Sequence, residues 1–245
     1  IFKYIGKSGR AIVNGDDDKL CTLRGKLKNV LTYGLNADND IRGENVKDMG
    51  LEGMRFDIVY GGGRITATIP SPGIHMVMNS LCAAAVGLTL GIEQELIKQG
   101  IESYAPVEGR MQIIKTQRLT LLDDSFNANP TSMAAAINIA CRASGRTVLI
   151  LGDMLELGEK GAEYHRDMGK KAVECGADMM IGKGPLMKNA CEETERAGIE
   201  TMHFDTSEDI MRALDNCLRD GDTVLVKASH GTNLKDVAEY IKANF

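Results

Sequence analysis

Short apolar runs alternate with amphipathic stretches throughout the second half of the chain. Runs rich in Val, Ile, Leu and Met predict strands, and the stretches between them, with apolar positions three or four residues apart, predict helices. The strands are expected at 119–122, 147–151, 179–181, 201–204 and 223–226, and the helices at 132–142, 162–175, 185–197, 208–219 and 234–243. Strands that alternate with helices of about 10–15 residues indicate βαβ units, so we predict an α/β domain with a mainly parallel sheet.

Turn and cap residues support these boundaries. Four glycines follow predicted helices, where a left-handed backbone commonly ends a helix. They are Gly145, Gly176, Gly198 and Gly221. Pro185 suits the first position of its helix, and Thr206 or Ser207 is expected to cap the next one.

The first half has a different pattern. Its predicted strands are 30–33, 57–60 and 65–69, and the last two are joined by GGGR, which indicates a hairpin. An apolar, Ala-rich helix is expected at 75–90 and an amphipathic one at 93–103. YAPVEGR at 104–110 carries Pro and Gly and breaks the pattern, so it is the candidate linker between two domains.

Composition excludes several classes of function. The 29 Lys and Arg against 34 Asp and Glu give a net charge of -5, and Trp is absent, which argues against a nucleic-acid partner. No apolar run approaches the ~20 residues that insertion into a membrane requires. The 6 cysteines form no CxxC pair and the 4 histidines have no metal-ligand spacing, so we expect reduced thiols, a cytoplasmic protein and no metal site of its own. Ile1 is not followed by a signal-peptide pattern, and the chain is expected to be a piece of something longer.

YIGKSGRA at 4–11 superficially suggests a phosphate loop. The GxxxxGK(S/T) pattern requires a leading Gly after a buried strand, and that position would precede Ile1. A helix end followed by a turn is the better interpretation.

Residues 123–130, DDSFNANP, follow the apolar run at 119–122 and are mostly short and polar. Asp, Asn and Ser bond readily to their own backbone, so the stretch could simply turn the chain. Open α/β sheets also bind ligands at the carboxyl ends of their strands, so the same residues could form the rim of a site. The octapeptide alone leaves both interpretations open.

ILGDMLELG at 150–158 also follows a predicted strand. The carboxylates of Asp153 and Glu156 either solvate a loop or hold an ammonium group or a cation.

VLVKASHGTN at 224–233 carries Lys227, Ser229 and His230 before a predicted helix. A lysine beside the N–H groups of a helix start attracts anions, and an ordinary capped helix with Lys227 in water explains the pattern equally well.

Three residues outside these stretches are further candidates. His75 begins the helix at 75–90, and Asn79 shares its face one turn later. A histidine at a helix start is more often a polar cap than a base or ligand. Arg110 lies in the linker, where it is either solvated or meets a ligand held between two domains.

Together these stretches resemble the Mur ligases, ATP-dependent enzymes that build the peptide of the peptidoglycan precursor. DDSFNANP is similar to the family's DDSYNANP signature, and LGDMLELG, followed by HRDMG at 165–169, is similar to its LGDMxELG loop. GIHMVMNSLCAAAVGLTLGI resembles its GxHNxxNxLAAxAV helix, EGR at 108–110 its inter-domain arginine, and VLVKASHGTNL its VLVKGSRxxxxE stretch. The first two motifs are the most specific, and the resemblance covers nearly the whole chain.

The resemblance implies a parent protein with three domains: one for a UDP-sugar, a central ATPase domain and a C-terminal Rossmann-like domain. Residues 1–110 would be the later part of the central domain, and 111–245 the whole C-terminal domain. The family's P-loop and carbamylated lysine would then lie upstream of Ile1, so we expect this piece alone to be inactive.

The implied reaction adds D-alanyl-D-alanine to UDP-N-acetylmuramoyl-tripeptide through an acyl phosphate, with ATP and Mg²⁺ as cofactors and only small molecules as partners. The implied catalytic residues are Lys227, His75 and Arg110. The implied ATP contacts are Asn79, Arg110, Asp124, Asn127 and Asn129. The implied substrate contacts are Asp153, Glu156, Lys227, Ser229 and His230. A folylpolyglutamate synthase and a non-catalytic nucleotide-binding or interaction module remain as alternatives.

The chain departs from the family pattern at three positions. Met76 stands where the family has Asn, Phe126 where it has Tyr, and His230 where it has Arg, so a fixed charge becomes titratable. Lys227 is expected to be an exposed charge, so Lys227→Ala should lower turnover and leave the melting temperature almost unchanged.

Overall fold

The protein divides into two compact units, residues 1–105 and 106–245. The structure, a computed structural model, describes residues 2–6 and 8–245. Lys7, at the centre of the YIGKSGRA stretch, lies outside the described residues. The predicted linker at 104–110 spans the division between the units.

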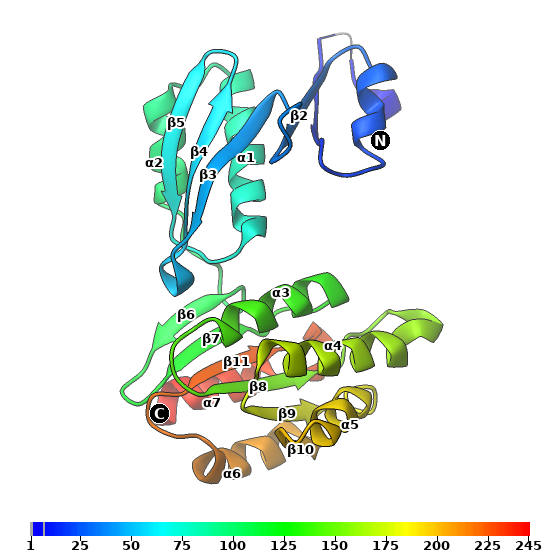
Figure 1. The fold of residues 1–245 in the computed structure, drawn as a ribbon, viewed down its shortest axis with the longest axis vertical. Helices are drawn as coiled ribbons and strands as arrows, with labels where there is room; N and C mark the ends of the chain where they lie inside the picture. Colours follow the sequence, from blue (N-terminus) through cyan, green and yellow to red (C-terminus); the bar gives the residue numbers. More distant parts are fainter. Residues whose placement is uncertain (1, 7) are drawn as a thin grey trace. The chain divides into compact units, whose positions relative to one another are not determined.

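The first unit is built on a mixed sheet in the order β1-β2-β3-β4-β5, in which β1 to β3 run parallel and β3 to β5 antiparallel. Its strands are β1 (Ala11–Asn14), β2 (Val30–Gly34), β3 (Ile41–Asp48), β4 (Met54–Tyr60) and β5 (Gly63–Ile69). Its helices are α1 (Ile74–Thr89) and α2 (Gln94–Glu102), with 3-10 turns at Phe2–Tyr4, Cys21–Gly25 and Gly50–Glu52. Side chains of α1 and α2 form one core with the strands, so both helices lie on the same face of the sheet (Figure 1).

The predicted helices of this unit and its hairpin are confirmed. β4 pairs with β5 from Tyr60↔Gly63 onward, around the turn that the GGGR stretch predicts. β1 and β3 were not predicted. In β3 only Ile41 and Gly43 are buried, because its alternate side chains face an open surface where Glu44 pairs with Arg64 at 2.8 Å. β3 therefore lacks the run of apolar residues by which a strand is recognised in a sequence.

The second unit is a mainly parallel α/β domain, as predicted. Its sheet has the order β10-β9-β8-β11-β7-β6, and of these pairs only β6–β7 is antiparallel among the described residues. The strands are β6 (Gln112–Lys115), β7 (Thr120–Asp124), β8 (Thr147–Gly152), β9 (Met179–Lys183), β10 (Glu200–Phe204) and β11 (Thr223–Lys227). The helices are α3 (Pro130–Cys141), α4 (Gly161–Cys175), α5 (Lys188–Arg196), α6 (Ser207–Cys217) and α7 (Lys235–Asn244), with 3-10 turns at Gly158–Lys160 and His230–Thr232.

The helices of this unit form two layers. α6 and α7 share an apolar core with one face of the sheet, and α3, α4 and α5 pack side by side on the other face (Figure 1). This is the Rossmann-like arrangement that the resemblance implied.

Most local predictions for the second unit hold. Thr206 caps α6 by accepting a hydrogen bond from the Asp209 N–H at 3.1 Å. Gly176 and Gly198 end α4 and α5 with a positive φ, as predicted. Gly145 and Gly221 also have a positive φ, but they lie in turns beyond the caps of α3 and α6, so they do not end those helices. Pro185 is wrong as a first helical residue, because α5 begins at Lys188. The short edge strand β6 was missed, since its four residues are at most half-buried.

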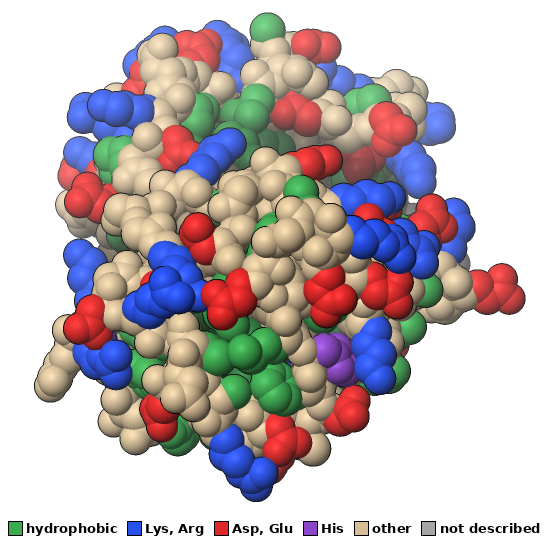
Figure 2. All heavy atoms as spheres, turned by 60° about the horizontal axis from the view of Figure 1, so that its bottom comes forward, with side chains coloured by type: hydrophobic (Ala, Val, Ile, Leu, Met, Phe, Trp, Pro, Cys, Tyr) green, Lys and Arg blue, Asp and Glu red, His purple; other side chains and the backbone are tan. Residues whose placement is uncertain are grey.

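The surface agrees with the composition. On the face shown in Figure 2, acidic and basic side chains are interspersed. Among the described residues no helix combines the length and the apolar character needed to cross a membrane. The six cysteines are free thiols, and burial raises the pKa of Cys141 to about 12 and that of Cys191 to about 11.

Candidate functional site

The carboxyl ends of β7, β11 and β8 lie side by side, because β11 sits between the other two strands. The chain leaves β7 and β8 toward α3 and α4 on one face of the sheet, and leaves β11 toward α7 on the other (Figure 1). Such a reversal is the switch point at which open α/β sheets bind ligands. The three motifs that the sequence singled out follow these three strands.

Lys227 is the central residue of this edge. It ends β11 directly opposite Asp124, the last residue of β7, and its side chain is 2% exposed. The ammonium group donates to Asp124 Oδ2 at 2.5 Å and to the Asn127 carbonyl oxygen at 2.9 Å. The other oxygen of Asp124 accepts the Met111 N–H at 3.0 Å. The prediction that Lys227 is an exposed charge is therefore wrong.

This burial changes the role that Lys227 can have. Both of its described bonds go to the DDSFNANP loop, so the lysine fixes that loop to β11. An ion pair removed from water needs both partners, since either one left alone is an uncompensated buried charge. Its predicted catalytic and substrate contacts stay predictions.

Ser229 joins the three loops to one another. It is buried, and its Oγ accepts the Leu155 N–H at 3.0 Å and donates to the Ala128 carbonyl at 3.3 Å. Its own N–H donates to the Asp153 carbonyl at 3.1 Å. One short side chain thus connects the loops after β7, β8 and β11, and a contact of Ser229 with substrate stays a prediction.

The carboxylate of Asp153 is turned toward the end of β9. Its Oδ1 accepts the Met187 N–H at 2.7 Å and its Oδ2 the Leu186 N–H at 3.2 Å. Gly184, with φ of 101°, leaves no room for a side chain beside it, because a Cβ there would lie 2.6 Å from the Asp153 Cγ. Asp153 therefore orders the turn before α5, which explains why α5 begins later than predicted, and its contact with substrate stays a prediction.

Glu156 differs from Asp153 in its exposure and in its hydrogen bonding. It is exposed, and its carboxylate makes no hydrogen bond or ion pair with any residue that the structure describes. Its backbone is left-handed, with φ of 62°. A residue other than Gly in this conformation is uncommon and suggests a functional reason for keeping it.

An exposed aromatic ring contacts an arginine and a histidine at the rim. Phe126 is 43% exposed, and the Arg110 guanidinium lies 4.1 Å from its ring centroid. The His230 ring lies 5.6 Å away and is tilted by 43°. Phe126 and His230, two of the three departures from the family pattern, are therefore in contact with each other.

The two asparagines of the loop have separate positions. Asn127 is exposed, and its Oδ1 accepts the N–H of the next residue, Ala128, at 2.9 Å. Asn129 caps α3 in a capping box with Ser132, at 2.8 and 3.1 Å. Asn129 thus stabilises the start of α3, and the nucleotide contacts of both residues stay predictions.

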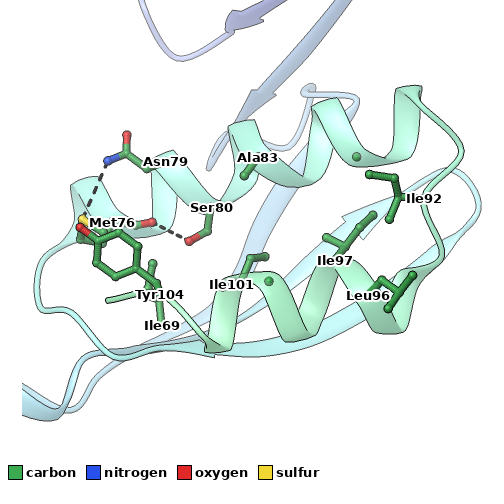
Figure 3. A pocket seen from close by; sticks show the side chains of 12 residues that line it. Ile69, Met76, Asn79, Ser80, Ala83, Ile92, Leu96, Ile97, Ile101 and Tyr104 are labelled. Atoms are coloured by element: carbon green, nitrogen blue, oxygen red, sulfur yellow. Dashed lines mark hydrogen bonds between the residues drawn. The ribbon is translucent and has the colours of Figure 1, made fainter. Parts of the chain in front are cut away.

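In the first unit, His75 and Asn79 lie exposed on the first turns of α1. Asn79 borders a cavity of about 430 Å³ between α1 and α2, beside Met76, Ser80 and Tyr104 (Figure 3). Its amide contacts the Met76 sulfur at 3.8 Å. Met76, the third departure, is buried in the core of this unit.

Two residues were missed as parts of the site. His165 entered only as a letter of the HRDMG motif, yet its ring accepts the Met154 N–H at 2.9 Å. Lys183 ends β9, and its ammonium donates to Ser207 Oγ at 2.8 Å and to the Thr232 carbonyl at 2.5 Å, which holds the turn that carries His230. For Lys183 the only available signal was its place after an apolar run.

Throughout residues 2–6 and 8–245, no three His, Cys, Asp or Glu side chains are grouped as ligands of a metal ion.

Family models match both units. The middle domain of the Mur ligases matches residues 1–87, and the Mur ligase glutamate ligase domain matches residues 109–230. The chain belongs to the Mur ligase family.

Individual Mur ligases agree with this assignment. A UDP-N-acetylmuramoyl-tripeptide–D-alanyl-D-alanine ligase of Buchnera aphidicola is 30% identical over 98% of the chain, and that of Bacillus subtilis is 32% identical over 85%. The matches span 52% and 46% of those relatives, so the chain spans about half of their length.

Solved structures show the same fold. MurF from Acinetobacter baumannii has a TM-score of 0.88 and 25% identity over 100% of this chain and 54% of its own. MurF from Thermotoga maritima, solved in complex with ADP, has a TM-score of 0.80 and 21% identity over 96% of this chain and 53% of its own.

Lys227→Ala is expected to lower the free energy of unfolding of the second unit by about 3 kcal/mol, the lower end for a broken buried pair, because Asp124 loses its ion pair but stays partly exposed and keeps the Met111 N–H. Lys235→Ala is the matched control. Lys235 pairs with Glu108 at 2.9 Å, both side chains are 59% exposed, and little change is expected. Urea unfolding followed by circular dichroism measures both variants, and equally small losses would remove Lys227 as the anchor of the loop.

Proposed function

We propose that the chain is part of a UDP-N-acetylmuramoyl-tripeptide–D-alanyl-D-alanine ligase. In that enzyme it would bind the ribose side of ATP and the dipeptide. The observation that carries this proposal is the junction of three motif loops at one switch point, tied together by Lys227 and Ser229. Two relatives named for this reaction, 30% and 32% identical to the chain, support the choice of reaction.

The proposed reaction has two steps. The γ-phosphoryl group of ATP passes to the carboxylate that ends the tripeptide, which gives an acyl phosphate and ADP. The dipeptide amine then attacks the acyl carbon, phosphate leaves and an amide bond forms. Positioning of two substrates and stabilisation of charge provide most of the catalysis in such reactions.

Accessible polar groups of the edge would bind ATP. The partly exposed Asp124 ends β7 and the exposed Asn127 follows it, and their carboxylate and amide groups suit the hydroxyl groups of a ribose. Asp124 keeps this capacity although it pairs with Lys227, since a carboxylate has about four acceptor positions. Arg110 supplies a fixed positive charge beside Phe126.

The loop after β8 would bind the dipeptide. Glu156 carries an exposed carboxylate with no partner among the described residues, and an ammonium group is the charge that complements it. Asp153 is not needed for that contact, because its oxygens already accept two backbone N–H groups.

The decisive experiment joins the chain to the part of a relative that precedes the matched region. A chimera of the preceding half of the Bacillus subtilis ligase with residues 1–245 is expected to release phosphate only when ATP, the UDP-tripeptide and D-alanyl-D-alanine are all present. The 245-residue chain alone should release none. A folded chimera that binds ATP without turnover would favour the non-catalytic module, and turnover with glutamate in place of the dipeptide would favour a folylpolyglutamate synthase.

Asn127→Ala in the chimera is expected to raise the KM for ATP by up to about tenfold, the effect of one hydrogen bond worth ~0.5–1.5 kcal/mol. The KM for the dipeptide should not change. Asn127 is a cleaner test than Asp124, because loss of Asp124 would leave Lys227 buried without its partner. Asn244→Ala, which removes an exposed amide from the last turn of α7, is the control and should leave the KM for ATP unchanged. An unchanged KM for ATP in Asn127→Ala would remove this residue from the site.

Glu156→Gly is expected to weaken dipeptide use without weakening the fold. Glycine adopts a left-handed backbone without penalty, so stability should stay equal or rise by up to about 1 kcal/mol. The KM for D-alanyl-D-alanine should rise about tenfold, and the KM for ATP should stay the same, consistent with a lost charge-assisted contact. Glu163→Gln, which removes an exposed charge from α4, is the control. A normal KM for the dipeptide would assign the left-handed residue to the turn alone.

A further inference from the structure

His165 is a fully buried histidine beneath the loop of residues 153–157. It lies on α4, and its exposed fraction is 0%. Its Nδ1 lies 2.6 Å from the Gly161 carbonyl oxygen, and its Nε2 lies 2.9 Å from the Met154 nitrogen. Both ring nitrogens are therefore used by the backbone, one by the start of α4 and one by the loop.

These two partners determine where the ring carries its proton. The Gly161 carbonyl can only accept a hydrogen bond, so Nδ1 must donate. The Met154 N–H can only donate, so Nε2 must accept with its lone pair. His165 is thus the neutral tautomer protonated at Nδ1, and a proton on Nε2 would face the Met154 N–H and abolish that bond.

The nearest acidic group does not compete for the ring. Asp153 Oδ1 lies 3.9 Å from Nε2, beyond hydrogen-bond distance. Both oxygens of Asp153 already accept the N–H groups of Leu186 and Met187. The charge of this carboxylate is therefore compensated without a protonated histidine.

The backbone of the loop of residues 153–157 is held by hydrogen bonds. Glu156 has a left-handed backbone, which costs a residue other than Gly about 1–2 kcal/mol and persists only where the surroundings enforce it. The two preceding residues are both anchored through their N–H groups, Met154 to His165 and Leu155 to Ser229 Oγ at 3.0 Å. The two anchored residues stand directly before Glu156. Their hydrogen bonds therefore fix the backbone from which the side chains of Leu155 and Glu156 project.

We propose that His165 is a positioning residue whose neutral Nδ1–H tautomer holds Met154 and so presents Glu156 at the open edge of the sheet. The tautomer and the order of the loop are properties of the fold. The consequence for D-alanyl-D-alanine rests on the function proposed above.

A pair of matched variants separates the two ring nitrogens. The amide of Asn reaches the position of Nδ1, and the longer amide of Gln reaches that of Nε2. His165→Gln therefore keeps an acceptor for the Met154 N–H, and His165→Asn removes it while burying the same chemical group. In the 245-residue chain, amide hydrogen exchange at Met154 should speed up by about tenfold or more in His165→Asn, the effect of one lost buried hydrogen bond, and by much less in His165→Gln. Tyr164→Phe, at the neighbouring position of α4, should leave the exchange unchanged.

A second measurement does not depend on any variant folding. Nitrogen NMR of the wild-type imidazole is expected to show a bonded proton at Nδ1 and a bare Nε2. A proton on Nε2 in the folded protein overturns the proposal, and so does equal exchange at Met154 in the Asn and Gln variants.

The effect on the reaction is tested separately in the chimera. His165→Asn should raise the KM for D-alanyl-D-alanine severalfold with little change in the KM for ATP, and His165→Gln should restore it. Equal KM values in the two variants would contradict the presentation of Glu156. If the wild-type chimera has no activity, the proposed function fails, and the exchange and NMR measurements still decide whether His165 positions the loop.

Discussion

The ion pair between Lys227 and Asp124 is the interaction on which the rest of the functional edge depends. Two adjacent parallel strands end with opposite charges in register, and the lysine of the pair is buried while the carboxylate is partly exposed. A buried ion pair contributes little net stability compared with apolar side chains, but it tolerates no loss of either partner. It therefore fixes the relation between β7 and β11 at the point where their loops begin.

The residues of this edge that are central to the site fall into two groups with different physical roles. Lys227, Ser229, Asp153 and His165 are buried, and their described hydrogen bonds go to neighbouring loops. Arg110, Phe126, Asn127, Glu156 and His230 are exposed. Ligand contacts need precise positions, and precision comes from supporting residues whose own hydrogen-bonding capacity is satisfied. The first group supplies that support, which leaves the second group available for substrates.

The sequence predicted the second unit well because its strands are buried on both faces and its helices have a regular apolar period. It missed β3, in which one face is charged, and β6, which is short and lies at an edge. The motifs identified the candidate site residues, but they did not predict which of these residues are buried. Lys227 meets Asp124 across 103 positions of sequence, and no local pattern reports which residue stands opposite a strand end. The same limit applies to Asp153 and His165, whose partners lie on other elements.

The contact between Phe126 and His230 gives a physical meaning to two departures from the family pattern that looked independent in the sequence. An arginine beside a tyrosine would provide a permanent charge and a hydroxyl group at this rim. The phenylalanine keeps the ring face, on which Arg110 still lies at 4.1 Å. The histidine keeps an aromatic contact at 5.6 Å and carries charge only when protonated. Arg110 is then the permanent cation beside this ring, whereas His230 adds a positive charge only when it is protonated. The two departures thus meet in one contact of this rim, beside the fixed charge of Arg110.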